Sequence, residues 1–198
     1  MSKDSLVVGL AGVFFGILVG WIIGSQQGTV APAPAPVAAA SQPGTAGAQA
    51  APPLDETRAS ALKTTAQQNP ADAGSRVQLG NMYFDAGRFP EAAEWYEAAL
   101  KIQPRDVNAS TDLGIAYYYM NQPDQALQQF DRSLAIDPKH GKTLLNIGIV
   151  RAFGKQDLKG AAAAWQRVLV AAPGTDEARA AQQALEGVKA AHPDVDRK

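Results

Sequence analysis

The sequence predicts an all-α protein: a solenoid of three stacked helix pairs with N- and C-terminal capping helices, preceded by one N-terminal transmembrane helix and a disordered Pro/Ala linker. Three observations support this prediction. Residues 6–24 form an unbroken apolar run, and residues 25–54 are rich in Pro and Ala. From residue 73 onward, a set of Gly, Ala, aromatic and Pro positions recurs at an offset of 34 residues.

The composition of the 198 residues argues against several classes of function. The net charge is −1 and Lys and Arg are interspersed with Asp and Glu, whereas a nucleic-acid binder needs a clustered basic surface. The chain has no Cys, which excludes disulfides and thiolate metal sites. His140 and His192 stand alone, without partners at metal-ligand spacing. We therefore expect no metal and no cofactor.

Residues 6–24 are predicted to cross a membrane as one helix. The run is about 28 Å long at the helical rise, close to the hydrocarbon thickness of a bilayer. Trp21 lies near one end, as an interfacial anchor does. Lys3 precedes the run and no Lys or Arg follows until Arg58, so residues 1–5 are expected in the cytoplasm. The expected location is the cytoplasmic (inner) membrane, single-pass, with the helical domain periplasmic or otherwise extracytoplasmic.

A cleaved signal peptide is the alternative interpretation of this run. The run is longer than the usual apolar core of a signal peptide, so we favour the anchor. The helix also carries glycines four residues apart, a spacing that lets a second helix approach closely. This stripe predicts homo- or hetero-oligomer formation in the membrane through Gly12, Gly16, Gly20 and Gly24.

Residues 25–54 are expected to form a flexible spacer. Alternating Ala-Pro cannot build helical hydrogen bonds and favours polyproline II. The Ala/Gly/Ser/Gln stretch that follows is typical of a flexible linker. Such a spacer holds the helical domain away from the bilayer. A proline-rich docking ligand is the less favoured alternative, because the basic residue usual in such motifs is missing.

Internal repeats occupy residues 73–175. Leu79-Gly80 recurs 34 residues later as Leu113-Gly114, and a third copy continues with Ile147-Gly148. The third copy has one extra residue, which we place in the turn between its two helices. The other recurring positions are Tyr83 and Tyr117; Ala92, Ala126 and Ala161; Tyr96, Phe130 and Trp165; Leu100, Leu134 and Leu169; and Pro104, Pro138 and Pro173.

This pattern resembles the tetratricopeptide-repeat (TPR) family, and the whole chain is similar to an N-terminally membrane-anchored TPR protein. The resemblance implies two antiparallel helices per repeat, A and B, with repeats at about 73–106, 107–140 and 141–175. The glycines allow close approach to helix A, the aromatic side chains fill the space between helix pairs, and each proline ends a helix B. One repeat cannot bury its apolar face alone, so three stacked copies share a core.

The flanking segments are expected to cap the solenoid. Asn69-Pro70 precedes Pro104 by 34 residues, so residues 55–68 are predicted to be a helix B without its helix A. Thr175 is expected to cap a last helix that ends near Ala190. The TPR domain is thus expected at 55–191, followed by a tail at 192–198. The apolar face of the last helix is predicted to carry Ala178, Ala181, Leu185 and Val188.

The TPR resemblance implies that a concave groove lined by the A helices binds a peptide. The groove positions are largely apolar and aromatic, which fits a hydrophobic or amphipathic segment of a partner protein. Tyr119 and Phe153 are favoured as contacts over Phe84 and Tyr118, which family members often use for packing. The predicted peptide-binding residues are Val77, Asn81, Phe84, Asn108, Ile115, Tyr118, Tyr119, Lys142, Leu145, Ile149 and Phe153, with Asp85 and Thr111 at neighbouring groove positions.

One branch of the family holds a C-terminal carboxylate of heat-shock chaperones in a clamp of Lys, Asn, Asn, Lys and Arg. At the matching positions only Asn81 and Lys142 agree with that pattern. The missing cations and the presence of an aspartate disfavour a carboxylate ligand. The five residues at these positions are Val77, Asn81, Asp112, Lys142 and Asn146.

Together these features predict a membrane-anchored TPR scaffold or chaperone-like adaptor that acts in assembly of an envelope complex. No catalytic residues are predicted, since the repeats contain no Ser-His-Asp set, phosphate loop or metal-spaced cluster. Two alternatives remain: a permanent structural subunit of a membrane complex, and an organelle import receptor. The missing clamp counts against the import receptor.

Overall fold

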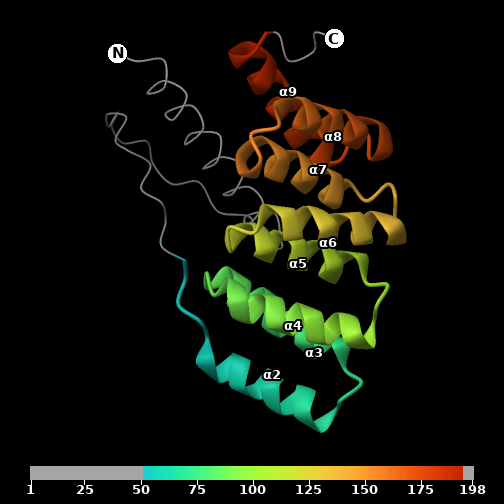
Figure 1. Cartoon of the computed structure of the whole chain (residues 1–198). Coiled ribbons are helices and arrows are strands. Elements are labelled where there is room, and N and C mark those ends of the chain that lie inside the picture. Colours follow the sequence, from blue (N-terminus) through green and yellow to red (C-terminus); the bar gives the residue numbers. More distant parts are fainter. Residues whose placement is uncertain (1–50, 194–198) are drawn as a thin grey trace, which may run out of the picture. The chain divides into compact units, whose positions relative to one another are not determined.

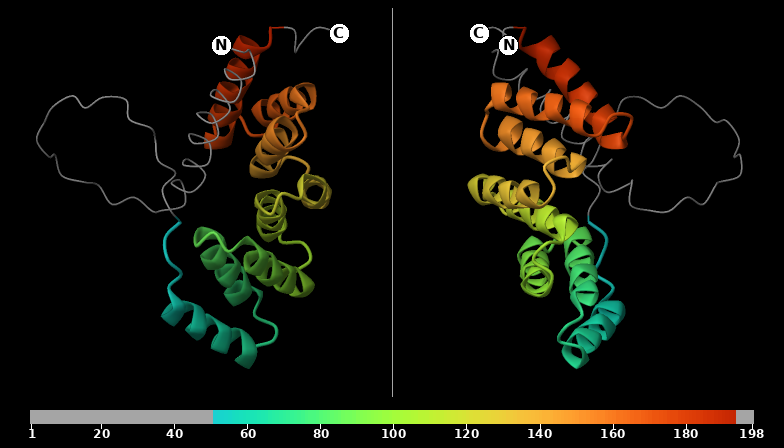
Figure 2. Two further views of the ribbon diagram at one scale, coloured as in Figure 1. Left: turned by 60° about the vertical axis from the view of Figure 1, so that its left-hand side comes forward. Right: turned by 90° about the vertical axis from the view of Figure 1, so that its right-hand side faces the viewer.

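The computed structural model describes residues 51–193, whose regular structure is entirely helical (Figure 1). Helices α3, α5 and α7 each pack against the next helix, and the pairs stack between α2 and α9 (Figures 1 and 2). The predicted all-α repeat solenoid is confirmed for these residues. The elements are α2 (Glu56–Gln68), α3 (Ala73–Asp85), α4 (Phe89–Ile102), α5 (Val107–Tyr119), α6 (Pro123–Ile136), α7 (Gly141–Ile149), the π-helical segment η1 (Val150–Gly154), α8 (Leu158–Ala171) and α9 (Asp176–Ala191).

Several predictions concern residues outside the described range. They are the cytoplasmic residues 1–5, the transmembrane helix at 6–24 with its glycines, the linker up to residue 50, and residues 194–198 of the tail. Between residues 51 and 193, no helix is both long and apolar enough to span a membrane.

Side chains that accept hydrogen bonds from the first turn begin most of the helices. Asp55, Asp72, Asp106 and Asp157 each accept a backbone N–H at 2.8–3.0 Å, at the starts of α2, α3, α5 and α8. Thr175 caps α9 as predicted, accepting from the Ala178 N–H at 3.2 Å. Each such cap stabilises its helix by about 1 kcal/mol. Two residues beyond the ends of α4, α6 and α8 stand the predicted terminating prolines, Pro104, Pro138 and Pro173.

A glycine on each helix A receives the aromatic ring of helix B in the same repeat. A Cβ placed on Gly80 would lie 2.5 Å from Cε1 of Tyr96, too close for any carbon–carbon contact. The sequence predicts these glycines for close approach, and the structure shows that the approaching group is a ring rather than a backbone. The three rings are at most 2% exposed, so they cannot move aside. The pairs are Gly80–Tyr96, Gly114–Phe130 and Gly148–Trp165.

Two apolar clusters form the core, and α5 contributes to both. The first cluster joins α2 to α5, and the second joins α5 to α8. Both faces of α5 are therefore buried, which makes the second repeat the centre of the domain. The larger members are Leu79, Tyr83, Tyr96 and Leu113 in the first cluster and Ile115, Phe130, Ile147 and Val150 in the second.

The two end helices bury mainly alanine. In α2, Ala59 and Ala66 are buried, and α9 packs against α8 through a buried alanine face that ends at Leu185. Val188, predicted on the same face, is only partly buried. Small side chains let these helices lie close to their neighbours while their outer faces remain polar, as expected of solenoid ends.

The extra residue of the third repeat lies in helix A, not in the turn where the sequence comparison places it. In the second repeat the Gln122 N–H donates to the Tyr117 carbonyl at 2.9 Å, whereas in the third the Asp157 N–H donates to the Arg151 carbonyl at 2.8 Å. The third connection therefore spans one residue more, and η1 absorbs it, as a π-helical bulge absorbs an insertion. The turns themselves match, with positive φ at Gly87, Asn121 and Gln156.

Candidate peptide-binding face

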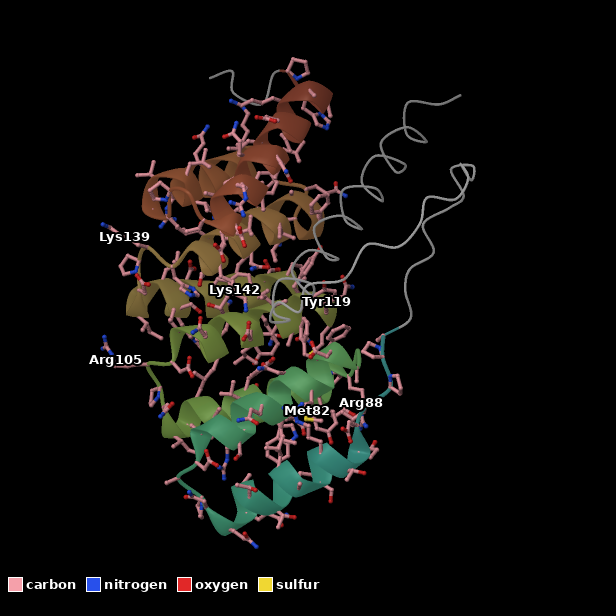
Figure 3. The ribbon with its side chains drawn as sticks, turned by 180° about the vertical axis from the view of Figure 1, so that it is seen from behind. Met82, Arg88, Arg105, Tyr119, Lys139 and Lys142 are labelled. Carbon is pink, nitrogen blue, oxygen red and sulfur yellow. The ribbon has the colours of Figure 1, made fainter. Side chains whose placement is uncertain are left out.

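Helices α3, α5 and α7 with η1 form the side of the domain that we call the A-helix face. All of the predicted peptide-binding residues belong to these elements. Figure 3 labels Tyr119 and Lys142, which project from α5 and α7. The residues with surface to offer a ligand are Val77, Asn81, Phe84, Asn108, Tyr118, Tyr119, Lys142 and Phe153.

Three of the predicted contacts lie in the interior instead. Ile115 and Ile149 are 5% and 6% exposed, and Leu145 is 1% exposed. Ile115 belongs to the second core cluster, together with Phe130. The Leu145 carbonyl accepts the indole N–H of Trp165 at 3.2 Å. Because these three side chains are buried, they support the A-helix face from within and leave little surface for a ligand.

Four rings gather at the end of the A-helix face where the helix A to helix B turns lie. Tyr119 contacts all three others: it stacks on Phe89 with ring centroids 4.6 Å apart, and meets Phe84 and Tyr118 edge-on at 5.4 and 5.8 Å. Phe84 also meets Phe89 at 5.2 Å. Such edge-to-face and stacked contacts stabilise aromatic groups beyond the area they bury. We call these four residues the aromatic cluster.

The hydroxyl groups of the aromatic cluster stay neutral in ordinary buffers. Burial, with a smaller effect of Tyr118, raises the pKa of Tyr119 to about 12. Burial also raises the pKa of Tyr118. The cluster is thus an uncharged apolar surface that carries two hydroxyl groups.

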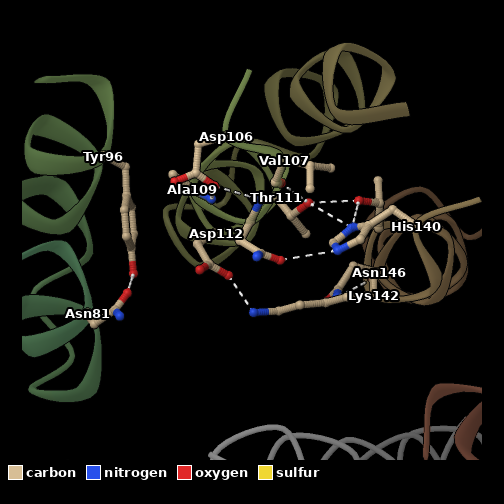
Figure 4. A network of polar contacts seen from close by, with 12 residues as sticks. Asn81, Tyr96, Asp106, Val107, Ala109, Thr111, Asp112, His140, Lys142 and Asn146 are labelled. Carbon is tan, nitrogen blue, oxygen red and sulfur yellow. Dashed lines mark hydrogen bonds and ion pairs between the residues drawn. The ribbon is translucent and has the colours of Figure 1, made fainter. Parts of the chain in front are cut away.

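A strip of polar groups crosses the A-helix face beside the aromatic cluster. The Lys142 ammonium donates to Asp112 Oδ1 at 2.6 Å, and the Tyr96 hydroxyl donates to Asn81 Oδ1 at 2.7 Å (Figure 4). The Asn146 amide donates to the Lys142 carbonyl at 2.8 Å. Asn81 and Lys142, the two residues that agree with the carboxylate clamp, therefore both have internal partners.

A second polar network joins α5 to the start of α7 (Figure 4). Thr111 and Thr143, both fully buried, share a hydrogen bond of 2.7 Å. His140 Nδ1 lies 2.7 Å from Thr143 Oγ1, and its Nε2 lies 3.2 Å from Asn108 Oδ1. His140, which the sequence gives no role, thus links the second and third repeats.

We expect the free energy of unfolding to fall as the pH drops through about 6.5, the ordinary pKa of His140. Burial lowers the pKa of His140 in the folded protein; Lys142 adds to this, while Asp137, Asp112 and Glu177 oppose it. Below pH 6.5 the unfolded chain therefore takes up a proton at His140 more readily than the folded chain does. The free energy of unfolding decreases with falling pH until the pKa of the folded state is reached. Urea unfolding of wild type and His140→Gln at pH steps from 7.5 to 5.5 measures this. A wild-type curve parallel to that of the variant would contradict the assignment.

A separate surface hollow of about 520 Å³ lies between α4 and α6, over α5. Its floor includes Ser110 and Gln129, and the Gln129 amide donates to Ser110 Oγ at 2.8 Å. Ser133 also donates to Ser110 Oγ at 2.8 Å. Since these polar groups bond to one another, they present no unsatisfied partner to a ligand, and no predicted binding residue lines the hollow. Across the described range, no group of His, Asp and Glu could hold a metal ion.

The repeated helix pairs, each with its glycine–aromatic contact, define a helical-repeat scaffold. Residues 72–139 and residues 111–177 each match a model of the tetratricopeptide repeat, and together they cover more than half of the chain. The chain therefore contains tetratricopeptide repeats and is a protein-interaction scaffold of that class. No curated protein gives a match to the sequence.

Solved structures of TPR proteins share the fold. MamA superimposes with a TM-score of 0.58 at 20% identity, over 69% of this chain and 80% of that one. The first TPR domain of human RPAP3 superimposes with a TM-score of 0.57 at 24% identity, over 66% of this chain and 99% of that one. The Sgt2 TPR domain of Aspergillus fumigatus superimposes with a TM-score of 0.56 at 25% identity, over 64% of this chain and 83% of that one.

Proposed function

We propose that this chain is a membrane-anchored scaffold whose A-helix face holds an apolar or amphipathic segment of a partner protein during assembly of an envelope complex. The aromatic cluster is the observation that carries this proposal. Four contacting rings at one end of the A helices supply an apolar surface. Aromatic residues are enriched among the residues that dominate binding energy.

The sequence supports the anchor and its orientation. The apolar run at 6–24 has the length of a bilayer span, and the lack of Lys and Arg between Lys3 and Arg58 favours export of the repeats. In this arrangement the A-helix face meets partners outside the cytoplasm. Protease added to spheroplasts should then degrade the repeat domain, and full protection would contradict the orientation.

One structural neighbour is seen with a peptide ligand. The first TPR of Spaghetti (RPAP3) is seen bound to the HSP90 peptide SRMEEVD, and matches this chain with a TM-score of 0.51 at 24% identity, over 70% of this chain and 95% of that one. The last four residues of that peptide, Glu-Glu-Val-Asp, include three acidic side chains. On the A-helix face of this chain, Lys142 is already paired with Asp112. We infer that this chain holds its partner through apolar contact rather than through a carboxylate.

Tyr119→Ala is expected to weaken binding of the partner segment at least tenfold, because Tyr119 contacts the three other rings of the cluster. Losing a central aromatic anchor typically costs about 2 kcal/mol or more of binding energy. The measurement is crosslinking of the full-length chain in native membranes, followed by mass spectrometry and quantification of each crosslinked partner. Tyr117→Phe is the matched control, since the Tyr117 hydroxyl bonds to Glu97 and takes no part in the cluster.

The same experiment separates an exchanging scaffold from a permanent subunit. Several substoichiometric partners that decrease with Tyr119→Ala support the scaffold, whereas one stoichiometric partner indicates a subunit. Retention of all partners in Tyr119→Ala, with the helix content unchanged by circular dichroism, would exclude the A-helix face as the binding surface.

A further inference from the structure

Resting on the proposed function, we propose that the segment held on the A-helix face carries a Lys or Arg next to its apolar anchor, so that the anchor contacts the aromatic cluster while the cation meets the carboxylates of Asp85 and Asp112. The partner is thus a cationic amphipathic segment, opposite in charge to the ligand of a carboxylate clamp.

The position of Asp85 is the first step. Asp85 is the last residue of α3 and directly follows Phe84 of the aromatic cluster, and it is exposed. Asn81 lies one helical turn earlier on the same side of α3, and its amide oxygen accepts from the Tyr96 hydroxyl. A side chain that reaches past the aromatic cluster along α3 therefore meets a carboxylate first.

The charge balance of the polar strip is the second step. Asp112 belongs to the strip and Asp85 lies at its edge on α3; these two carboxylates have one cation between them, because Lys142 pairs with Asp112. Among residues 51–193, no Lys or Arg lies within ion-pair distance of Asp85. The pKa of Asp85 is raised, first by partial desolvation of its carboxyl group beside the protein surface and then by the charge of Asp112. The strip therefore keeps an excess negative charge that a ligand cation can neutralise.

The nearby cations are committed elsewhere. Arg76 donates to the carbonyls of Ala66 and Asp72 at the junction of α2 and α3. Arg88 donates to Glu91 and lies over the Tyr83 ring at 4.8 Å. Turning either toward Asp85 would cost these contacts, which favours leaving the excess negative charge to a ligand.

The aromatic cluster itself favours a cation over an anion. The face of an aromatic ring carries partial negative charge and attracts Lys or Arg within about 6 Å of its centroid. Rings and carboxylates on one face thus select the same ligand charge. An acidic segment would face repulsion from Asp85 and would lose the attraction of the rings.

The test uses two fluorescent peptides with identical apolar residues, one with two Lys and one with two Glu, and the full-length chain in uncharged nanodiscs. At low salt the Lys peptide is expected to bind at least tenfold more tightly than the Glu peptide. The ratio should shrink as salt is raised, because exposed charges are then screened. Empty nanodiscs give the background binding of each peptide.

Asp85→Asn is the decisive variant, with Asp131→Asn on the exposed side of α6 as its matched control. Asp85→Asn should reduce affinity for the Lys peptide three- to tenfold, leave the Glu peptide unchanged or tighter, and leave the melting temperature equal or higher. The thermal result follows because the raised pKa means that the ionised Asp85 carboxylate is disfavoured in the folded chain.

The outcomes separate the two proposals. If both peptides bind equally and Tyr119→Ala weakens both equally, the charge selection is overturned while the proposed apolar binding surface is supported. Failure of both peptides to bind would overturn both proposals. Self-association of the chain that neither peptide displaces would assign the face to a second copy and overturn the inference. A Lys preference that Asp85→Asn reduces and Asp131→Asn does not would support it.

Discussion

Gly148→Ala is expected to destabilise the domain by about 1–3 kcal/mol, although alanine is the better helix former. A Cβ at this position would lie 2.5 Å from Cε2 of Trp165 and closer still to its Cδ1 and Nε1 atoms. The indole cannot retreat, because it is 1% exposed and its N–H bonds to the Leu145 carbonyl. Urea unfolding followed by circular dichroism measures the change in free energy.

The sign of this effect should reverse when the ring is removed. Trp165→Ala alone is expected to cost about 3–5 kcal/mol, the usual loss for a buried aromatic residue. In the Trp165→Ala background a Cβ at position 148 has room, so Gly148→Ala should then stabilise the helix by up to about 1 kcal/mol. Gly74→Ala on the exposed start of α3 is the control and should change little. If Gly148→Ala has the same sign in both backgrounds, the ring contact is not the reason for this glycine.

The glycine–aromatic pairs explain why the fold could be predicted from sequence. Gly80 and Tyr96 recur at the offset of 34 because each pair is a steric requirement within one repeat, so the sequence records it directly. The prolines after the B helices record the ends of those helices in the same way. The position of the extra residue in the third repeat left no such record. The recurring positions that flank it, Gly148 and Ala161, fit an insertion in the helix as well as one in the turn.

The candidate site could be predicted only in part, for a different reason. Phe84 and Tyr119 follow from the repeat pattern, but Phe89 is the first residue of a helix B, and its stacking on Tyr119 depends on how the turn folds back. Ile115 fits a groove position by register, yet in the structure it is a buried member of the second core cluster. The exposure of a side chain depends on the neighbouring repeats, so the residue pattern of a single repeat does not predict it.

Contacts between elements also decide what the charged groups do. In the sequence, Lys142 agrees with the carboxylate clamp and Asp112 departs from it, and nothing connects the two residues. The structure shows them as one ion pair of 2.6 Å, with Asp85 left over at the end of α3. Within residues 51–193 no ion pair compensates the Asp85 carboxylate. An uncompensated carboxylate is typical of a binding surface, where stability is given up for function.

Lys142→Met is expected to destabilise the domain by about 2–3 kcal/mol, because breaking a buried ion pair from one side leaves an uncompensated charge. The Lys142 and Asp112 side chains are only 22% and 17% exposed. The expected loss is below that of a fully buried pair, since water still reaches both groups. Lys139→Met, on an exposed turn, is the matched control and should have no measurable effect.

The double variant Asp112→Asn/Lys142→Met should recover most of that stability, because neither charge then remains unpaired. The peptide assay distinguishes a structural role of Lys142 from the proposed one. If Lys142 only holds α5 and α7 together, Lys142→Met lowers stability and peptide binding alike. If Lys142 partly neutralises a cation-binding strip, Lys142→Met frees Asp112 and should tighten the Lys peptide several-fold while the domain becomes less stable. The double variant should show neither change. If Lys142→Met lowers stability but tightens the Lys peptide, and the double variant does neither, both effects come from the unpaired Asp112 carboxylate.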